Sequence, residues 1–460
     1  MNQTPSKSLV LLLASTACFM VILDTTIVNV AVGSIRAHLG ATLSGMQWVV
    51  DAYALTFASL LLSAGAFADR VGSRRTFGWG LALFGAASLA CGLSTNLATL
   101  IVARGIQGAG AALLIPTSLS LISQNFPKPH ERARALAVYG GVGGGLAMVA
   151  GPLFGGILTD AFGWRSIFLI NVPIGLVSIL VAKRMGRDGF PSAGRGLDLP
   201  GQALAIIALA AATYFFIEGP SAGWTTPANL LAGAVAIIGG AAFVSNESRT
   251  EEPMLPLGLF KGREFSLSTL AGFMLNFAFY GQFFFLNVYL QQYLHLSPAQ
   301  AGLRFLPETL GGISFAMLGG RLAHKIAPRT IVIFGMGLSA IGMLVLTGFG
   351  LRGNAFQDSL ILVMVGAAIG TPASIIAVML NGVPTERAGI ASGVLNSARQ
   401  TGGLLGVAIL GALVGHSKEG IQLALWLASA AMAVGSLAAV SLKRSFIPAH
   451  RLAEAAAEAI

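Results

Sequence analysis

Ionisable side chains stand inside apolar stretches of this chain, where charge is costly. Asp24, Arg104 and Glu308 each lie within a long run of apolar residues, and Arg399, followed by Gln400, has the same setting. An unpaired charge inside a bilayer costs several kcal/mol, so such residues usually pair, face a polar cavity or mark an ion pathway. A buried carboxyl group can load and release a proton near neutral pH. These residue types predict proton or cation handling within a membrane.

Asp24 and Arg104 each leave two interpretations open. Asp24 is either a proton-exchanging carboxyl group or a neutral carboxyl group that hydrogen-bonds between helices. Arg104 cannot realistically lose its proton, but its charge can hold a nearby carboxylate and release it when helices move. Alternatively, Arg104 is a structural residue whose guanidinium reaches the outer membrane surface.

Asp51 and Glu308 are two further candidate acidic sites. Asp51 lies near the predicted outer end of segment 46–67. It either attracts cationic substrates by its charge or simply contacts interfacial water. Glu308 follows Pro307 and is either a second proton or cation site or the ion-pair partner of Arg304, one helical turn back.

Fourteen apolar stretches position these side chains. The 460 residues are 55% hydrophobic and only 10% charged, whereas a soluble domain carries about 25% charged residues. A transmembrane helix needs roughly 20 apolar residues, and a helix satisfies every backbone polar group within lipid. The sequence therefore predicts an all-α integral membrane protein with fourteen transmembrane helices. The predicted spans are 9–33, 46–67, 77–95, 98–123, 134–158, 164–183, 199–218, 227–245, 266–290, 299–323, 329–349, 357–380, 388–415 and 421–442.

Basic residues are distributed unevenly between the two ends of the predicted helices. The loops on the side of both termini hold most lysines and arginines, whereas the opposite side has only Arg36, Arg165, Arg352 and Lys418. Because cytoplasmic loops are enriched in basic residues, both termini are predicted to be cytoplasmic. The same bias accounts for the net charge of +10 without a nucleic-acid partner.

Two segments recur at a constant offset of 255 positions. Residues 65–74 align with 320–329, and residues 129–133 align with 384–388. The shared offset predicts two six-helix bundles related by a parallel repeat, an arrangement known from transporters, with two helices inserted between them. The predicted units are an N-terminal bundle (1–190), two inserted helices and a loop (191–262), a C-terminal bundle (263–445) and a cytoplasmic tail (446–460).

Two glycine-containing motifs are candidates for moving parts. The first, a loop after the second span, contains Gly65, Asp69, Arg70, Gly72 and Arg74. Its carboxylate can pair with arginines across an interface and latch one side closed, or the loop is an ordinary basic cytoplasmic loop. The second motif contains Gly151, Pro152, Gly155 and Gly156. Its glycines make a smooth face for close helix packing, and its proline bends the helix.

These motifs resemble those of the major facilitator superfamily. The loop at 65–75 is similar to the signature loop of that superfamily, and other segments are similar to motifs of its drug:proton antiporters. Fourteen spans are typical of the EmrB/QacA branch, and residues 48–53 resemble a subset that includes antibiotic-producer resistance pumps. The segments that carry the resemblance are 23–31, 48–53, 65–75, 104–108 and 151–156.

The resemblance implies a fold and several roles. It implies two six-helix bundles, with Arg104 as the coupling arginine and Gln107 one turn further along the helix. The loop around Asp69 would gate the cytoplasmic side, and the motif around Pro152 would mark an antiporter and keep leak paths shut. The second-half loop has His324 at the usual acidic position, so a weaker gate is expected there. Other departures from the family pattern are Val32, Gly33, Ser73 and Ala147.

The combined prediction is proton-coupled efflux of hydrophobic or amphipathic, cationic drugs or antibiotics by alternating access across a bacterial inner membrane. The alternatives are an importer, a dedicated exporter of one natural product or metabolite, and a non-transporting membrane sensor. No enzyme, cofactor or metal site is predicted, because the sequence lacks a phosphate loop, a histidine cluster and a nucleophile motif. The predicted partners are a small-molecule substrate, protons and membrane lipid, and the protein is predicted to be a monomer.

Overall fold

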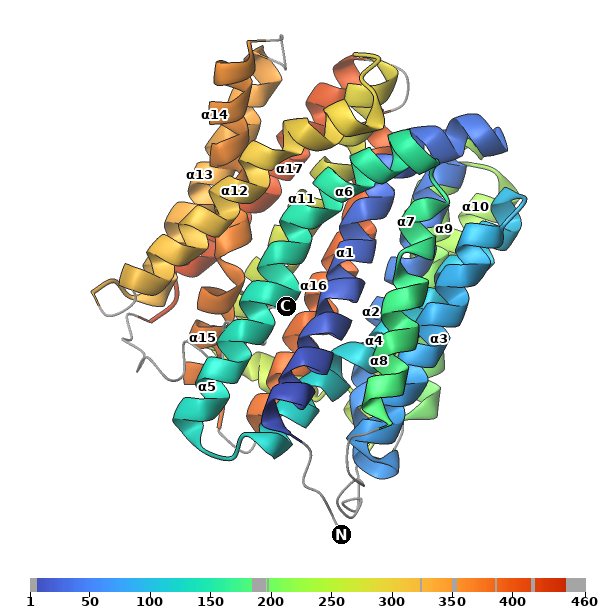
Figure 1. Cartoon of the computed structure of the whole chain (residues 1–460). Coiled ribbons are helices and arrows are strands. Elements are labelled where there is room, and N and C mark those ends of the chain that lie inside the picture. Colours follow the sequence, from blue (N-terminus) through green and yellow to red (C-terminus); the bar gives the residue numbers. More distant parts are fainter. Residues whose placement is uncertain are drawn as a thin grey trace.

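The computed structural model describes residues 6–183, 196, 198–322, 325–349, 354–384, 387–414 and 418–443. Throughout these ranges the regular structure is helical (Figure 1). The predicted tail 446–460, His324 and Arg352 lie outside the described residues.

Six helical segments make up the first half of the chain. Thr42 and Asn96 begin two of them by accepting a backbone N–H of the first turn, as N-cap residues do. In the fifth segment, a glycine-rich π-helix joins two α-helices without a break. The elements are α1 (Lys7–Leu39), α2 (Leu43–Val71), α3 (Ser73–Leu93), α4 (Leu97–Asn125), α5 (Pro129–Val138), η1 (Tyr139–Leu146), α6 (Ala147–Phe162), α7 (Ser166–Leu169) and α8 (Asn171–Ala182).

The inserted pair and the second half follow. The inserted hairpin is α9 (Leu199–Ala222) and α10 (Pro227–Arg249), and Asp198 caps its first helix through the N–H of Gly201. The later elements are η2 (Leu257–Lys261), α11 (Arg263–Gln292), α12 (Pro298–Leu322), α13 (Pro328–Phe349), α14 (Ala355–Gly366), η3 (Ala367–Gly370), α15 (Pro372–Asn381), α16 (Ala388–Val414) and α17 (Lys418–Val440).

Twelve helical stretches of the described chain are long and apolar enough to cross a membrane. All fourteen predicted segments coincide with helices, but two of them do not meet that standard. The stretch Ser166–Ala182 is shorter than the others. The second, α12, contains the charged residues Arg304, Glu308 and Arg321, which reduce its hydropathy. The count of fourteen spans therefore stays a prediction.

Three seams join the two halves of the bundle. We call the end where α1 begins the proximal end and the opposite end the distal end (Figure 1). At the distal end α1 meets α11, where Gln291 donates to the carbonyl of Val30 at 2.7 Å, and α6 meets α12. The third seam, between α2 and α16, extends further along the helices. It runs from Gln47, which donates to Val407 O, to Ala58, whose carbonyl accepts from Ser397.

The inserted hairpin packs beside the third seam. Its helix α9 contacts both α2 and α16. Gln202 donates to the carbonyl of Ser59 at 2.9 Å, and Glu218 accepts the indole N–H of Trp48 at 2.8 Å. These hydrogen bonds attach α9 to the first half.

Candidate functional site

Asp24 and Arg104 meet in the interior of the first half. Helix α1 supplies the carboxylate and α4 supplies the guanidinium, which form a salt bridge through Asp24 Oδ2 and Arg104 Nη1. Gln107, one turn after Arg104 on α4, bridges the pair. It accepts from Arg104 at 2.8 Å and donates to Asp24 Oδ1 at 2.8 Å. The structure therefore brings together the three residues that the first-half motifs single out.

Burial makes this pair unusual. The side chain of Asp24 is 0% exposed and that of Arg104 is 1% exposed. Arg104 also donates its Nε–H to the carbonyl of Val49 at 3.0 Å, and its guanidinium lies 4.3 Å from the centre of the Tyr53 ring. The interpretation that Arg104 reaches the membrane surface is wrong, because its side chain is buried against α1 and α2. Buried ions are tolerated only with such complete pairing.

Two members of this network were not predicted. Asn171, at the start of α8, lies 3.4 Å from Asp24 Oδ1 and donates to Ser88 Oγ of α3 at 3.2 Å. Ser88 also accepts from Gln107 at 3.2 Å and donates to Phe168 O. Asn171 is the only amide side chain between Ser166 and Ala182, and this is the signal in the sequence that could have identified it.

Asp51 is buried without a partner. Its side chain is 0% exposed, and neither carboxylate oxygen has a hydrogen bond within the described part of the chain. It lies one turn after Gln47 on the same face of α2, and Gln47 donates to Val407 O across the seam with α16. The alternative that Asp51 merely contacts interfacial water is therefore wrong.

Glu308 is enclosed between α11 and α12. Gln282 of α11 donates to Glu308 Oε2 at 3.4 Å, and the other carboxylate oxygen has no partner among the described residues. Arg304 instead donates to Asp358 of α14 at 3.0 Å. The alternative pairing of Glu308 with Arg304 is therefore wrong. The ring of Phe283 packs 4.4 Å, centre to centre, from a ring on α12, so α11 and α12 also meet through aromatic packing.

The candidate acids form three separate environments. No hydrogen bond or ion pair of the described chain joins Asp51 or Glu308 to the Asp24 network. In the second half, Arg399 donates to Asn396 Oδ1 at 3.2 Å on its own helix, and its stem packs against Gly272 of α11. Gln400 is half-buried beside it.

The signature-like loop fastens the proximal end of the first half. Gly72, with φ of +104°, makes the turn between α2 and α3. Arg74 donates to the last carbonyls of α8, Ala182 O at 3.4 Å and Lys183 O at 3.3 Å. A Cβ on Gly65 would meet nothing within 4 Å, so no neighbouring helix packs closely against this glycine.

The loop has a counterpart in the second half. Arg329, which the repeat aligns with Arg74, donates to the carbonyl of Leu442 at 2.6 Å. Asp69 and Arg70 also make interactions, so several residues of the first-half loop are held in place.

The Gly-Pro motif is a contact surface on two sides. A Cβ on Gly151 or Gly155 would collide with Thr26 or Ile27 of α1. A Cβ on Gly156 would lie 2.6 Å from the Cα of Ala299 on α12. The predicted close packing is therefore present. The structure adds that α6 packs against α1 within its own half and against α12 of the other half.

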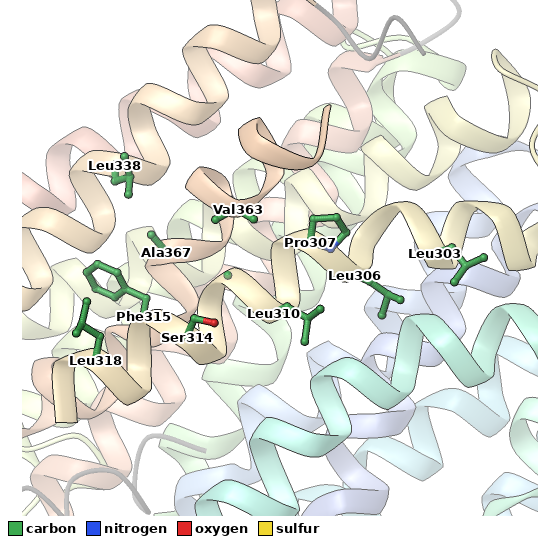
Figure 2. A pocket seen from close by; sticks show the side chains of 11 residues that line it. Leu303, Leu306, Pro307, Leu310, Ser314, Phe315, Leu318, Leu338, Val363 and Ala367 are labelled. Atoms are coloured by element: carbon green, nitrogen blue, oxygen red, sulfur yellow. The ribbon is translucent and has the colours of Figure 1, made fainter. Parts of the chain in front are cut away.

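An apolar groove of about 600 Å³ runs along α12 but is not the polar site (Figure 2). Leu303, Leu306 and Leu310 line it from α12, and Val363 lines it from α14. Ser314 is the only polar side chain in the lining, and Glu308 is not part of it. The groove therefore lacks groups that could orient a charged substrate.

The family profile described as Major Facilitator Superfamily matches residues 14–407. The chain belongs to this superfamily. It is 38% identical to the methylenomycin A resistance protein of Streptomyces coelicolor over 413 residues, covering 88% of this chain and 84% of the relative. The multidrug resistance protein Stp of Mycobacterium tuberculosis is 36% identical, over 90% and 76% of the two chains. The tetracenomycin C resistance and export protein of Streptomyces glaucescens is 34% identical, over 88% and 75%.

Solved structures show the same fold at lower identity. The xylose transporter XylE from E. coli, in a partially occluded inward open conformation, gives a TM-score of 0.63 at 16% identity, over 95% of this chain and 98% of that one. The human organic anion transporter MFSD10 gives 0.65 at 16%, over 95% and 100%. The chain is thus a multi-pass membrane transporter of this superfamily, in agreement with the predicted fold class and with transport rather than catalysis.

Proposed function

We propose that the protein exports hydrophobic or amphipathic compounds, with a preference for cations, in exchange for protons. The observation that carries this proposal is the fully buried ion pair of Asp24 and Arg104. Two charges in the interior of a membrane protein are costly, and their attraction only offsets that cost when the geometry is good. One proton on Asp24 would break the ion pair, so the pair can act as a proton-controlled switch.

A proton on Asp24 would remove the negative charge that holds Arg104. The guanidinium would keep the carbonyl of Val49 and the side-chain oxygen of Gln107 as acceptors. Protonation therefore loosens the link between α1 and α4 without leaving the arginine unpaired. Helix α1 also packs on α6 of its own half and contacts α11 of the other half. A movement of α1 would therefore change contacts in both halves.

The contacts between the halves favour a conformation that is closed at the distal end. The seam of α1 with α11 and the seam of α6 with α12 are both distal. Away from that end the two halves diverge, and the last turns of α12 lie apart from α5 (Figure 1). We assign the proximal end to the cytoplasm because its loops are basic. In this conformation substrate would enter from the cytoplasm, and all fourteen helical segments would cross the plasma membrane.

The substrate preference rests on the two acids without cationic partners. Asp51 and Glu308 are fully buried, and each has at least one carboxylate oxygen without a hydrogen bond in the described chain. A cationic substrate would supply the missing charge. The relatives named for drug and antibiotic resistance support compounds of this class. The cycle needs no cofactor, because the proton gradient supplies the energy, and one chain contains both halves, so a monomer suffices.

The deciding experiment is uptake of a cationic dye into everted vesicles whose interior is acidified. Wild-type protein is expected to accumulate dye, and a protonophore is expected to abolish this accumulation. Asp24→Asn keeps the shape of the side chain but cannot exchange a proton, so we expect it to lose accumulation driven by the gradient. Asp358→Asn is the matched control, since it opens another arginine–aspartate pair. Unchanged accumulation in Asp24→Asn, with folded protein, contradicts the proposal.

A dedicated exporter is the second candidate, and the names of two relatives favour it. Those relatives are named for resistance to methylenomycin A and for resistance to and export of tetracenomycin C, each a single compound. Competition by a panel of dyes and antibiotics in the same vesicles separates the candidates. Competition by many unrelated cations supports broad efflux, whereas competition by one compound supports dedicated export.

A further inference from the structure

One carboxylate of the first half binds the start of a helix in the second half. Asp160, near the distal end of α6, accepts the hydroxyl of Ser297 at 2.8 Å and the backbone N–H of Ala299 at 3.1 Å. Ser297 and Ala299 flank Pro298, the first residue of α12. The contact therefore crosses between the halves at the distal end.

The cap of α12 is shared between the two halves. The first N–H groups of a helix have no partner within the helix. Pro298 has no N–H, so Ala299 offers the first backbone donor of the helix, and this donor goes to Asp160. The N–H of Gln300 goes instead to Ser297 Oγ, from the same half. Separation of the halves would thus remove one acceptor from the first turn of α12.

Directly beneath this contact, α6 and α12 pack too closely to slide along each other. A Cβ on Gly156, one turn before Asp160, would lie 2.7 Å from the carbonyl oxygen of Pro298. A Cβ on Gly302 would lie 2.1 Å from the carbonyl oxygen of Pro152. The two helices therefore touch through their backbones, and the carboxylate lies at the outer rim of that contact, where its side chain is exposed.

We infer that Asp160 is the latch of the distal gate: its carboxylate holds α6 to the capped end of α12 and must release before that end can open. This inference rests on the proposed function, in which the distal end is closed while substrate enters from the cytoplasm and must later open to release it. The neighbouring α1–α11 seam uses amide side chains and Arg36. Asp160 differs because a negative charge faces a helix N-terminus, a favourable arrangement that no neutral group reproduces in full.

The latch also connects the distal gate to a buried acid. Glu308 lies further along α12 than the contact with Asp160. The backbone of α12 at Glu308 packs on Gly366 of α14. Because α12 is one continuous helix, movement of its first turn on release would be transmitted to the position of Glu308.

The test measures access to a cysteine beneath the latch. Val30 on α1 is 0% exposed, and its side chain lies beside Gly302 on α12. The parent for labelling carries Cys18→Ala, Cys91→Ala and Val30→Cys. A membrane-impermeant maleimide is applied to intact cells and to everted vesicles, so that the distal face is exposed in one preparation whatever the orientation.

Asp160→Ala is expected to raise the rate of labelling from the distal face several-fold over the parent. Asp160→Asn keeps an acceptor oxygen but not the charge, so a smaller increase is expected. Asp358→Asn, which breaks a contact within the second half only, is expected to leave the rate unchanged. A rate in Asp160→Ala equal to that of the parent overturns the latch. Size-exclusion profiles of all variants identify any loss of fold, and Asp160→Asn carries the test if the alanine variant does not fold.

A disulfide provides the second measurement. Oxidation of the pair Asp160→Cys and Ser297→Cys is expected to stop labelling at position 30, and reduction is expected to restore it. Persistent distal labelling after complete cross-linking overturns the latch. Both measurements report the conformation of the gate, so they remain informative if proton-driven uptake fails, and the two failures can be told apart.

Discussion

Two buried acids of this transporter, Asp24 in the first half and Glu308 in the second, are held in different ways. In the first half, Asp24 has a guanidinium and two amides around it. In the second half, Glu308 has a single amide donor at 3.4 Å and no cation within the described chain. The repeat aligns Asp24 with Phe279 and Glu308 with Tyr53. The repeat therefore does not carry either acid into the other half.

This difference indicates two distinct tasks. A paired acid resists change until a proton or a movement separates it from its partner. A buried carboxylate with an unsatisfied oxygen and no cationic partner can bind a cation. Substitutions that remove one member of each environment should therefore fail in different ways, and this contrast can be measured.

Loss of the guanidinium of Arg104 is expected to have the largest effect. Arg104→Gln leaves Asp24 buried with amide donors but without a cation, and removal of one partner from a buried pair costs about 3–5 kcal/mol. We expect no proton-driven uptake and a clearly lower unfolding temperature in detergent. Arg304→Gln is the comparison in the second half. The Arg304 side chain is 32% exposed, although the carboxylate partner is only 4% exposed, so we expect a smaller loss of stability than in Arg104→Gln.

The double variant Asp24→Asn with Arg104→Gln sharpens this test. It removes both charges and leaves two amides that can hydrogen-bond. We expect it to regain much of the stability lost in Arg104→Gln, but not the uptake. Equal unfolding temperatures for the single and double variants would show that the pair does not determine stability.

Loss of charge at Glu308 is expected to change selectivity more than stability. Glu308→Gln keeps the shape and hydrogen-bonding capacity toward Gln282, and no cation is left without a partner. We expect an unchanged unfolding temperature. Uptake of a cationic dye should fall about tenfold, which corresponds to roughly 1.4 kcal/mol, while a neutral substrate is retained. The measurement is the concentration dependence of uptake for both substrates, and an equal loss for both would remove Glu308 from substrate recognition.

The sequence allowed Asp24, Arg104 and Gln107 to be selected as candidates because they are local exceptions or motif residues, but it did not predict that they contact one another. A charge inside an apolar run is visible without a structure, and the motif places Gln107 one turn from Arg104. Asn171 and Ser88 escaped because neutral polar residues carry a weaker penalty in apolar segments. The helical segments were also predictable, since length and hydropathy are local properties.

The partner of Arg304 and the burial of Asp51 could not be predicted in the same way. Helical spacing favours Arg304 with Glu308, but α12 turns the glutamate toward α11 and the arginine toward Asp358, 54 positions away. The burial of Asp51 depends on how α2 packs in the bundle, which no local pattern specifies. Which faces of the halves meet, including the contact of Asp160 with α12, is likewise a tertiary property.

The smallest expected effect compares the two arginines that the repeat aligns. Arg74 and Arg329 each donate to carbonyls near the end of the last helix of their own half. Loss of one such hydrogen bond costs about 1 kcal/mol. We therefore expect Arg74→Ala and Arg329→Ala to lower the unfolding temperature by similar, small amounts, as measured by thermal denaturation in detergent.

Uptake should separate the two variants, because the first-half loop also contains Asp69 and Arg70, both engaged in interactions. If that loop is a gate and its counterpart only fastens helix ends, the maximal uptake rate falls a few-fold in Arg74→Ala and stays unchanged in Arg329→Ala. Equal losses of uptake would assign both loops the same task. The asymmetry between the halves would then be confined to their buried acids.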